Sequence, residues 1–342
     1  MADRDFSHPC EHIRYDNRRD IRNIIRPFEK IGKREISALT GLSIPTVSSL
    51  ISELLDSGEV IIIPESVSTG GRPAELYALN PMFSVYLTLA IQNASLLVRC
   101  CDARGNMLFE REEDFLQTSG PEALLDRIAE VLTAYPGLRV VAISVPGAVL
   151  DGTILYIPDY PNLAGICLQK IIEDKLNIRI ILENDVNVFV FAERERWESL
   201  VHLLHTGNGP GAGVLVGGTL VGGTSGYAGE VDFLPVRDEG GTIAFGTKLS
   251  KIAGINDPSE RKKEMIATLA QVLCAYICIL NPSDAALSGF GLLDSDIPDL
   301  HDAIALLAPE ERIMELHIVD ETHELSMAGL EMLAVDYLTE NL

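Results

Sequence analysis

The sequence has 342 residues, of which 47% are hydrophobic and 23% charged, and this balance excludes a disordered or fibrous chain. Its length predicts more than one domain. The net charge is −23, but residues 1–80 carry ten Lys/Arg and twelve Asp/Glu, so nearly all the excess acid lies further on. This distribution argues against nucleic-acid binding by the whole chain and leaves the N-terminal part as the segment able to bind DNA.

The six cysteines form no CxxC pair, so we expect neither a disulfide framework nor a four-cysteine metal site. No stretch approaches the roughly twenty apolar residues of a membrane helix, and the first residues lack the apolar core of a signal peptide. We therefore expect a cytoplasmic protein that does not interact with membranes.

The first 60 residues have the pattern of a helix-turn-helix. Residues 13–31 predict an amphipathic helix that Pro27 can end early. A second helical pattern stops at Gly41, which suits the left-handed backbone of a sharp turn. Ser43 then caps a third helix with Pro45 in its first turn. The apolar side chains of this helix recur at spacings of three and four, as one buried stripe: Val47, Leu50, Ile51, Leu54 and Leu55.

A polar face and a hairpin complete this pattern. Residues 60–63 predict a strand, and residues 68–73, with Arg72, predict the tip of a wing. Together these features indicate a winged helix-turn-helix that binds DNA. Arg72 would enter a minor groove. The outer face of the third helix would meet base edges or phosphates through Thr46, Ser48, Ser49 and Ser52. A helical hairpin that only packs is the alternative.

Basic residues precede the turn and predict phosphate contacts by the supporting helices. They are Arg14, Arg18, Arg19, Arg22, Arg26, Lys30, Lys33 and Arg34. The alternative is a solvated helix face. The head is close to neutral as a whole, so one copy should bind weakly, and a homodimer or homotetramer would present two recognition helices to two half-sites.

Asn80-Pro81 ends this segment, and strands alternate with helices from there on. We predict domains over residues 1–81, 82–198 and 199–342, the last two being lobes of an α/β or α+β body. The strands of the body are expected at 84–93, 94–102, 107–115, 139–145, 179–182, 199–205, 213–216 and 284–288, with a glycine-dense turn before 213 and a hairpin at 217–220. Its helices are expected at 121–135, 168–175, 186–198, 260–280 and 298–307.

Five short motifs, in this order, resemble the ROK family (repressors, open reading frames, kinases). They are Gly70-Gly71-Arg72-Pro73, Val145-Pro146-Gly147-Ala148-Val149, Tyr160-Pro161-Asn162-Leu163, Glu183-Asn184-Asp185-Val186-Asn187 and Ala228-Gly229-Glu230-Val231. The resemblance covers nearly the whole chain. It implies a winged helix head on a two-lobed, actin-like (ribonuclease H-like) sugar-kinase fold with a sugar cleft between the lobes.

The resemblance also implies roles for single residues. Asp185 matches the base that takes the proton from the attacking hydroxyl in the kinases. Asn162, Asn184, Asp185 and Glu230 match positions that bind sugar. The alternative for Asn184 and Asp185 is a helix N-cap without a ligand, although capping and binding are compatible.

The chain departs from the kinases where phosphate would bind. Ala90-Ile91-Gln92-Asn93-Ala94 stands where the family's first phosphate turn reads Asp-x-Gly-Gly-Thr, and Pro210 removes an amide from the second turn. We therefore expect that the protein is not an active kinase, that no residue acts in catalysis and that no nucleotide cofactor binds. Phe233 stands at the family's zinc histidine and residues 236–251 contain no cysteine, so no metal is expected. Phe233 could instead stack on a sugar or fill the cleft.

These observations predict a transcriptional regulator, a repressor of sugar metabolism, whose kinase-like body senses a sugar or sugar derivative. Its partners would be operator DNA and that effector. Two alternatives stay open, namely an active sugar kinase that carries a DNA-binding head and a regulator that answers to a protein partner.

Overall fold

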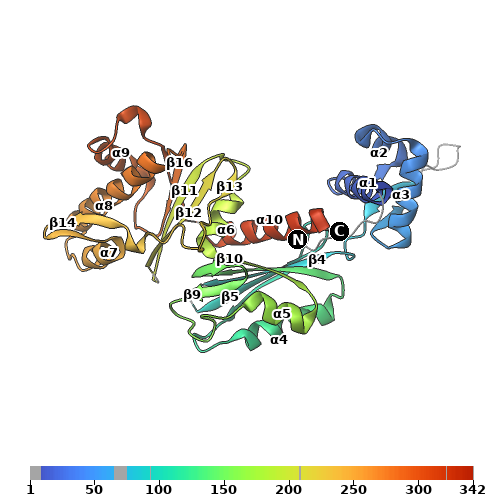
Figure 1. Ribbon diagram of the computed structural model, residues 1–342, viewed down its shortest axis with the longest axis horizontal. Helices are drawn as coiled ribbons and strands as arrows, with labels where there is room; N and C mark the ends of the chain where they lie inside the picture. Colours follow the sequence, from blue (N-terminus) through green and yellow to red (C-terminus); the bar gives the residue numbers. More distant parts are fainter. Residues whose placement is uncertain (1–8, 65–74, 93, 208, 321, 342) are drawn as a thin grey trace.

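The computed structural model describes residues 9–64, 75–92, 94–207, 209–320 and 322–341, with only the backbone for 9–15. The predicted wing tip, including Arg72, lies outside these ranges. Figure 1 shows three parts in a row: a helical head at one end, a first lobe and a second lobe. This arrangement of a helical region and two mixed α/β lobes is the predicted fold class.

The head packs three helices and a small sheet around one core. The helices are α1 (Pro9–Ile25), α2 (Lys33–Thr40) and α3 (Ile44–Asp56). The strands, β1 (Ile31–Gly32), β2 (Val60–Ile63) and β3 (Leu76–Leu79), form an antiparallel sheet of order β1-β3-β2. The helix predicted over 13–31 ends early, as its Pro27 had indicated, and begins before residue 13. It stops at Ile25 because Pro27 lacks an N–H and disfavours helical backbone at Arg26.

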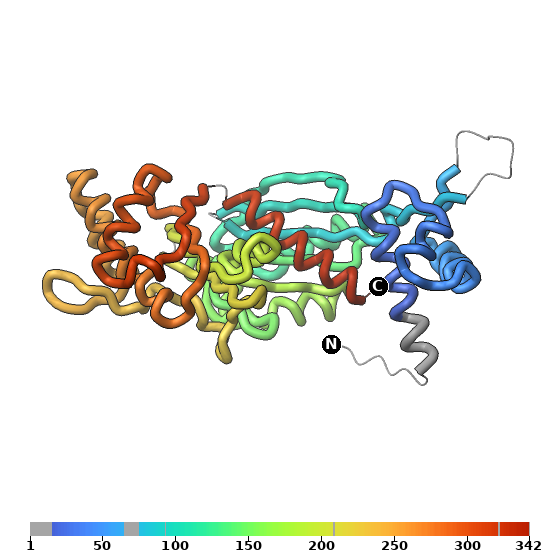
Figure 2. Tube along the Cα trace, turned by 90° about the horizontal axis from the view of Figure 1, so that it is seen from above, coloured from blue at the N-terminus to red at the C-terminus, as the bar shows by residue number. Residues whose placement is uncertain are grey.

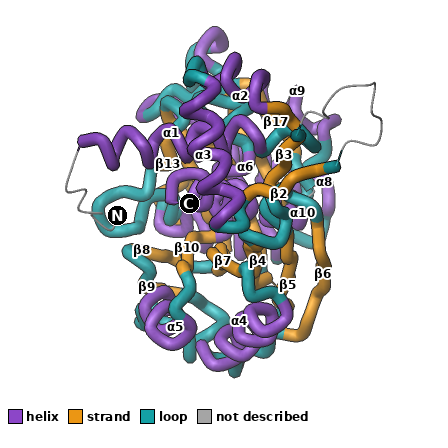
Figure 3. Tube along the Cα trace, turned by 90° about the vertical axis from the view of Figure 1, so that its right-hand side faces the viewer, coloured by secondary structure: helices purple, strands orange, loops and turns teal. Residues whose placement is uncertain are grey.

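The first lobe is built on a mixed sheet of order β10-β7-β4-β5-β6. Hairpins join β4 (Val85–Gln92), β5 (Ser95–Cys101) and β6 (Met107–Asp114), while β7 (Leu138–Val145) and β10 (Arg179–Asn184) run parallel to β4. A small hairpin, β8 (Ala148–Leu150) and β9 (Thr153–Tyr156), lies beside it. One face is covered by α4 (Pro121–Ala134) and α5 (Leu168–Leu176), which lie below the sheet in Figure 3.

The second lobe repeats this plan with a sheet of order β13-β12-β11-β16-β17. Its strands are β11 (Leu200–Thr206), β12 (Gly209–Val216), β13 (Thr219–Leu220), β16 (Asp284–Ser288) and β17 (Glu315–Ile318). The outer layer holds α7 (Phe245–Ala253), α8 (Pro258–Ile279), α9 (Ile297–Ala305) and the hairpin of β14 (Pro235–Asp238) and β15 (Gly241–Ala244). Three single turns of 3-10 helix occur at Val231–Phe233, Asp294–Asp296 and Glu310–Arg312.

Two helices cover the other face of the first sheet. They are α6 (Asp185–Ala192), shorter than the predicted 186–198, and α10 (Thr322–Asn341), which the sequence did not predict. Figure 2 shows α10 crossing above the sheet from the side of the second lobe to the head. The boundary after residue 198 stays a prediction, but the first sheet is covered in part by the end of the chain.

The glycine-dense segment before residue 213 is not a long turn. β12 begins at Gly209, which pairs with Thr206 at the end of β11, and the pairing continues to Leu200 and Leu215. Pro210 is tolerated as the second residue of the strand, near its end. Within the described residues, no single helix has the length and apolar character of a membrane span, although the pair α2 and α3, bent by 113°, does so when taken together.

Candidate functional site

The head contains a helix-turn-helix made by α2 and α3. Gly41 adopts a left-handed φ of 71° and its N–H donates to the carbonyl of Ser37, which ends α2. The Ser43 side chain accepts from the Thr46 N–H at 3.3 Å and starts α3. Of the predicted apolar stripe of α3, all but Leu55 is buried in the head core, and Leu55 is partly buried against it. The turn and its caps are therefore those that the sequence predicts.

The candidate DNA-binding side chains differ in exposure. Arg34, Ser49 and Ser52 are exposed, and Ser48 is half-buried. Thr46 is also half-buried, and its hydroxyl is 2.8 Å from the Ser43 hydroxyl, so its first role is within the cap. Of the four predicted residues on the outer face of α3, Ser49 and Ser52 are therefore the most accessible to DNA.

Three arginines expected to face phosphates point inward instead. Arg22 is buried, and its Nε donates to Glu59 at 2.9 Å; Arg18 donates to the other oxygen of this carboxylate. Arg26 donates to the hydroxyl of Thr339, on α10. The prediction for these residues was wrong because a buried carboxylate just before β2 requires cations, and helical spacing places Arg18 and Arg22 on one face.

A cleft of about 280 Å³ lies between the two lobes. The first lobe contributes the β8–β9 hairpin and the junction of β10 with α6, and the second contributes β12 and residues 222–230. Its polar lining includes Asp151, Tyr156, Glu183, Asn184, Asp185, Asn187, Thr206 and Glu230. Three of the four predicted sugar-binding residues are among these.

Asn184 and Asp185 stand where a strand becomes a helix. Asn184 is the N-cap of α6, accepting from the N–H groups of Val186 and Asn187 at 3.0 and 3.1 Å. Its amide nitrogen donates to the carbonyl of Gly147 at 3.0 Å. The alternative of a capping role is therefore met by Asn184, which lines the cleft at the same time.

Two carboxylates of the cleft, Asp185 and Glu230, interact with each other, and burial acts on both. Burial raises the pKa of Asp185 to about 7, and the nearby Glu230 adds to the rise. Burial likewise raises the pKa of Glu230, with a further contribution from Asp232. Among the described residues, no ion pair to Lys, Arg or His is found for Asp185 or Glu230, so a hydroxyl-rich ligand would find acceptors there that are not yet neutralised.

Glu183 lines the cleft, although no role was predicted for it. Its carboxylate accepts from the backbone N–H of Asn184 and the side chain of Asn187 at 2.8 and 2.9 Å, and burial raises its pKa. The signal was present, since Glu183 opens the motif that carries Asn184 and Asp185.

Two predicted residues lie elsewhere. Asn162 is exposed, does not line the cleft and donates to the carbonyl of Thr118 at 2.8 Å. Phe233 is 64% exposed and pairs with the ring of Tyr227 at 6.5 Å, so it neither fills nor lines the cleft. The prediction that Asn162 binds sugar is not supported by its place outside the cleft.

One group of described residues has the ligand types and closeness for a cation. The ligand atoms of Asp284, Glu315 and His317 lie within 4.8 Å of one another at the edge of the second sheet. Here the His317 Nε2 and the Asp284 carboxylate are already hydrogen bonded at 2.9 Å. Over residues 236–251, where no zinc site is expected, Asp238 forms ion pairs with Lys251 and Lys248. These two cations lower the pKa of Asp238 to about 2.

Comparison with known proteins finds similar sequences and a similar solved structure. Residues 94–247 match the model of the ROK family. Over 96% of its length the chain superposes on 98% of a ROK family transcriptional regulator described as a homolog of the E. coli MLC protein, with a TM-score of 0.70 at 18% identity. The match to the ROK family model covers somewhat less than half of this chain, in the first lobe and the start of the second.

Repressors and kinases both occur among its relatives. The xylose repressor of Bacillus subtilis is 26% identical over 234 residues, which are 64% of this chain and 60% of that repressor. The glucokinase of Thermotoga maritima is 29% identical over 153 residues, 42% of this chain and 48% of that enzyme. The match with the repressor thus spans about three fifths of the repressor's own length.

The segment that was expected to match the first phosphate turn of the kinases lies at a hairpin between β4 and β5. Gln92, the last residue of β4, pairs with Ser95, the first residue of β5. Ala94 has a left-handed φ of 66°, and its N–H donates to the hydroxyl of Tyr160 at 3.1 Å. That backbone donor is already engaged by a side chain of the protein.

Proposed function

We propose that this protein is a DNA-binding transcriptional repressor of the ROK family that senses a sugar and does not phosphorylate it. The observation that carries the proposal is the joining, in one chain, of a capped helix-turn-helix to a sugar-kinase-like body with a polar cleft. The similarity to xylose repressors supports the same role. D-xylose is therefore the first effector to test.

The cleft supports sugar binding through Asp185, Asn184 and Glu230. Small-molecule sites start at about 300 Å³, so the cleft suits a monosaccharide rather than a longer glycan. Sugar hydroxyls would donate to the carboxylates, which are held close together at a cost to the free protein. Binding a hydroxyl-rich ligand offsets that cost.

An active sugar kinase is the second candidate, and one observation favours it. A pKa of about 7 would suit Asp185 to act as a general base near neutral pH. Against this, Gln92 and Ala94 offer neither acid nor glycine at the first phosphate turn, and the Ala94 amide is occupied by Tyr160. Pro210 has no N–H to offer to a nucleotide.

Calorimetric titration of the full chain with D-xylose and a panel of hexoses and amino sugars tests the proposal. We expect one of these sugars to bind, Asp185→Asn to weaken it, and Asp126→Asn, an exposed carboxylate on α4, to leave it unchanged. A coupled assay should detect no sugar-dependent ATP turnover. Turnover that Asp185→Asn abolishes would overturn the proposal in favour of the kinase.

DNA binding is proposed to need two copies of the chain. The head is near neutral, and Arg18, Arg22 and Arg26 are committed to contacts within the chain. Few charges remain to release counterions from one half-site. Sedimentation of the protein with a selected operator should give at least two chains per duplex, and tight binding of one chain to one half-site would contradict this.

A further inference from the structure

α10 is placed to connect the cleft with the head. With 20 residues at about 1.5 Å each, it is about 30 Å long. Figures 1 and 2 both show it lying along the first sheet, with its first turn near α6 and the second lobe and its last turn near the head. A single rigid element therefore spans the distance between the two candidate sites.

At the cleft end, α10 packs closely on α6. A Cβ added to Gly329 would lie 2.1 Å from the carbonyl oxygen of Val188 and 2.7 Å from its side chain, so only glycine permits this approach. Arg194, just after α6, forms an ion pair with Asp336 at 2.6 Å. Because α6 begins with Asp185 in the cleft, a ligand that moved α6 would act directly on α10.

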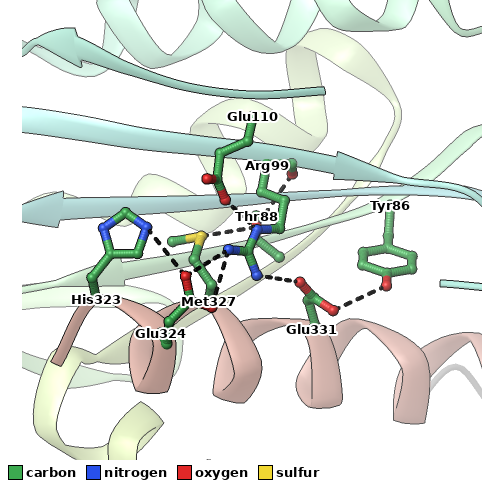
Figure 4. Close-up of polar contacts among 8 residues, drawn as sticks. All are labelled: Tyr86, Thr88, Arg99, Glu110, His323, Glu324, Met327 and Glu331. Carbon is green, nitrogen blue, oxygen red and sulfur yellow. Dashed lines mark hydrogen bonds and ion pairs between the residues drawn. The ribbon is translucent and has the colours of Figure 1, made fainter. Parts of the chain in front are cut away.

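Along its length, α10 is held to the sheet by buried charge as well as by apolar packing. Arg99 of β5 is buried, and its guanidinium donates to two carboxylates of α10, Glu331 at 2.9 Å and Glu324 at 3.4 Å, and to Glu110 of β6 (Figure 4). Tyr86 reaches the same Glu331 from β4. A guanidinium that donates to two carboxylates fixes the position and the angle of the helix that carries them. We therefore expect α10 to move as a rigid body rather than to bend.

At the head end, α10 touches α1. Arg26, directly after α1, donates to the hydroxyl of Thr339. Leu338 lies beside Arg22 and Leu79 of the head, around a small cavity at the junction. The head therefore meets the body through the last turn of the same helix that packs on the cleft.

We propose that α10 transmits occupancy of the cleft to the DNA-binding head, with the Val188–Gly329 contact as its input and the Arg26–Thr339 bond as its output. This inference rests on the proposed function, since it names the route by which a sugar would act on DNA binding. Coupling of this kind needs a continuous, packed path, and α6, α10 and α1 form one.

Amide hydrogen exchange on the full chain, without sugar or DNA, tests the route. Val188→Ala loosens the input contact without the backbone clash that Gly329→Ala would create. We expect it to change exchange in peptides from residues 16–25 of α1 by about two- to tenfold. In a Thr339→Val background, which removes the hydroxyl, we expect this change to vanish. Thr133→Val on α4, the same substitution away from α10, should leave it intact.

Two results would overturn the inference. One is exchange in α1 that does not respond to Val188→Ala, and the other is a response of equal size in the Thr339→Val and Thr133→Val backgrounds. Because neither sugar nor DNA is present, a chain that binds no sugar or no DNA still gives a result. Failure of the route is thereby distinguished from failure of the proposed function.

Discussion

The head and the cleft treat buried charge in opposite ways. In the head, the Glu59 carboxylate is 5% exposed and is shared by Arg18 and Arg22, so its charge is neutralised within the fold. In the cleft, Asp185 and Glu230 lie near each other without a cation that pairs with either of them among the described residues. Burial therefore raises the pKa of both carboxyl groups. The difference indicates that charge holds the head together, whereas the cleft keeps acceptors for a ligand.

Removing the carboxylate of the head should have the largest effect. Glu59→Gln removes the buried carboxylate that both Arg18 and Arg22 contact and should destabilise the head by about 3 kcal/mol. Exchange of head amides measures this, with exposed Glu29→Gln as the control. Unchanged exchange in Glu59→Gln would mean that the ion pair does not hold the head.

Removing the carboxylate of the cleft should have the opposite sign. The pKa of Asp185 in the folded state, about 7, lies above the ordinary value near 4. Between these pH values the folded state binds more protons than the unfolded state, so the free energy of unfolding falls as pH rises. Asp185→Asn should stabilise the protein at pH 8 by about 2 kcal/mol and much less at pH 4. Urea unfolding at the two pH values measures this. A destabilised Asp185→Asn at pH 8, with Asp126→Asn unchanged, would contradict it.

Sugar binding should depend on the same carboxylate. Donor hydroxyls favour the charged form of Asp185, so affinity should fall below pH 7 by up to about tenfold per pH unit. Calorimetry from pH 5.5 to 8 checks this. An affinity that is flat over this range would remove Asp185 from the binding site.

The smallest effects are expected on DNA. Arg34→Ala should weaken operator binding several-fold. It should also reduce the slope of log K against log salt concentration by about one, as the loss of one phosphate contact does. Ser49→Ala, which removes one neutral hydrogen bond, should cost about 1 kcal/mol or less and alter base preference. Arg237→Ala in the second lobe is the control. Equal losses for all three variants would place the DNA surface elsewhere.

Local signals predicted much of this molecule. Ser43, Pro45 and Gly41 act within a few residues of themselves, so the turn of the head could be derived from sequence. For α10 the local signal was present but was missed, since Met327, Leu330, Ala334 and Leu338 recur at helical spacing. Its ion pairs could not be derived, because Glu331 and Asp336 pair with Arg99 and Arg194 from distant parts of the chain. The inward turn of Arg22 toward Glu59 was missed for the same reason.

The cleft shows the same limit. Asn184, Asp185 and Glu230 line it, as the motifs led us to expect, whereas Asn162 is held outside by its bond to Thr118. A motif fixes which residues follow one another, but loop packing decides which of their side chains converge.

The most direct test of the account is operator affinity of the full chain with and without a saturating sugar. Anisotropy titrations on a selected operator, with D-xylose first and then any sugar that binds in the panel, should show a change in Kd of about fivefold or more. Thr339→Val should abolish that change while leaving sugar binding intact. An operator Kd that stays the same with the cleft occupied would contradict the claim that this body controls its head.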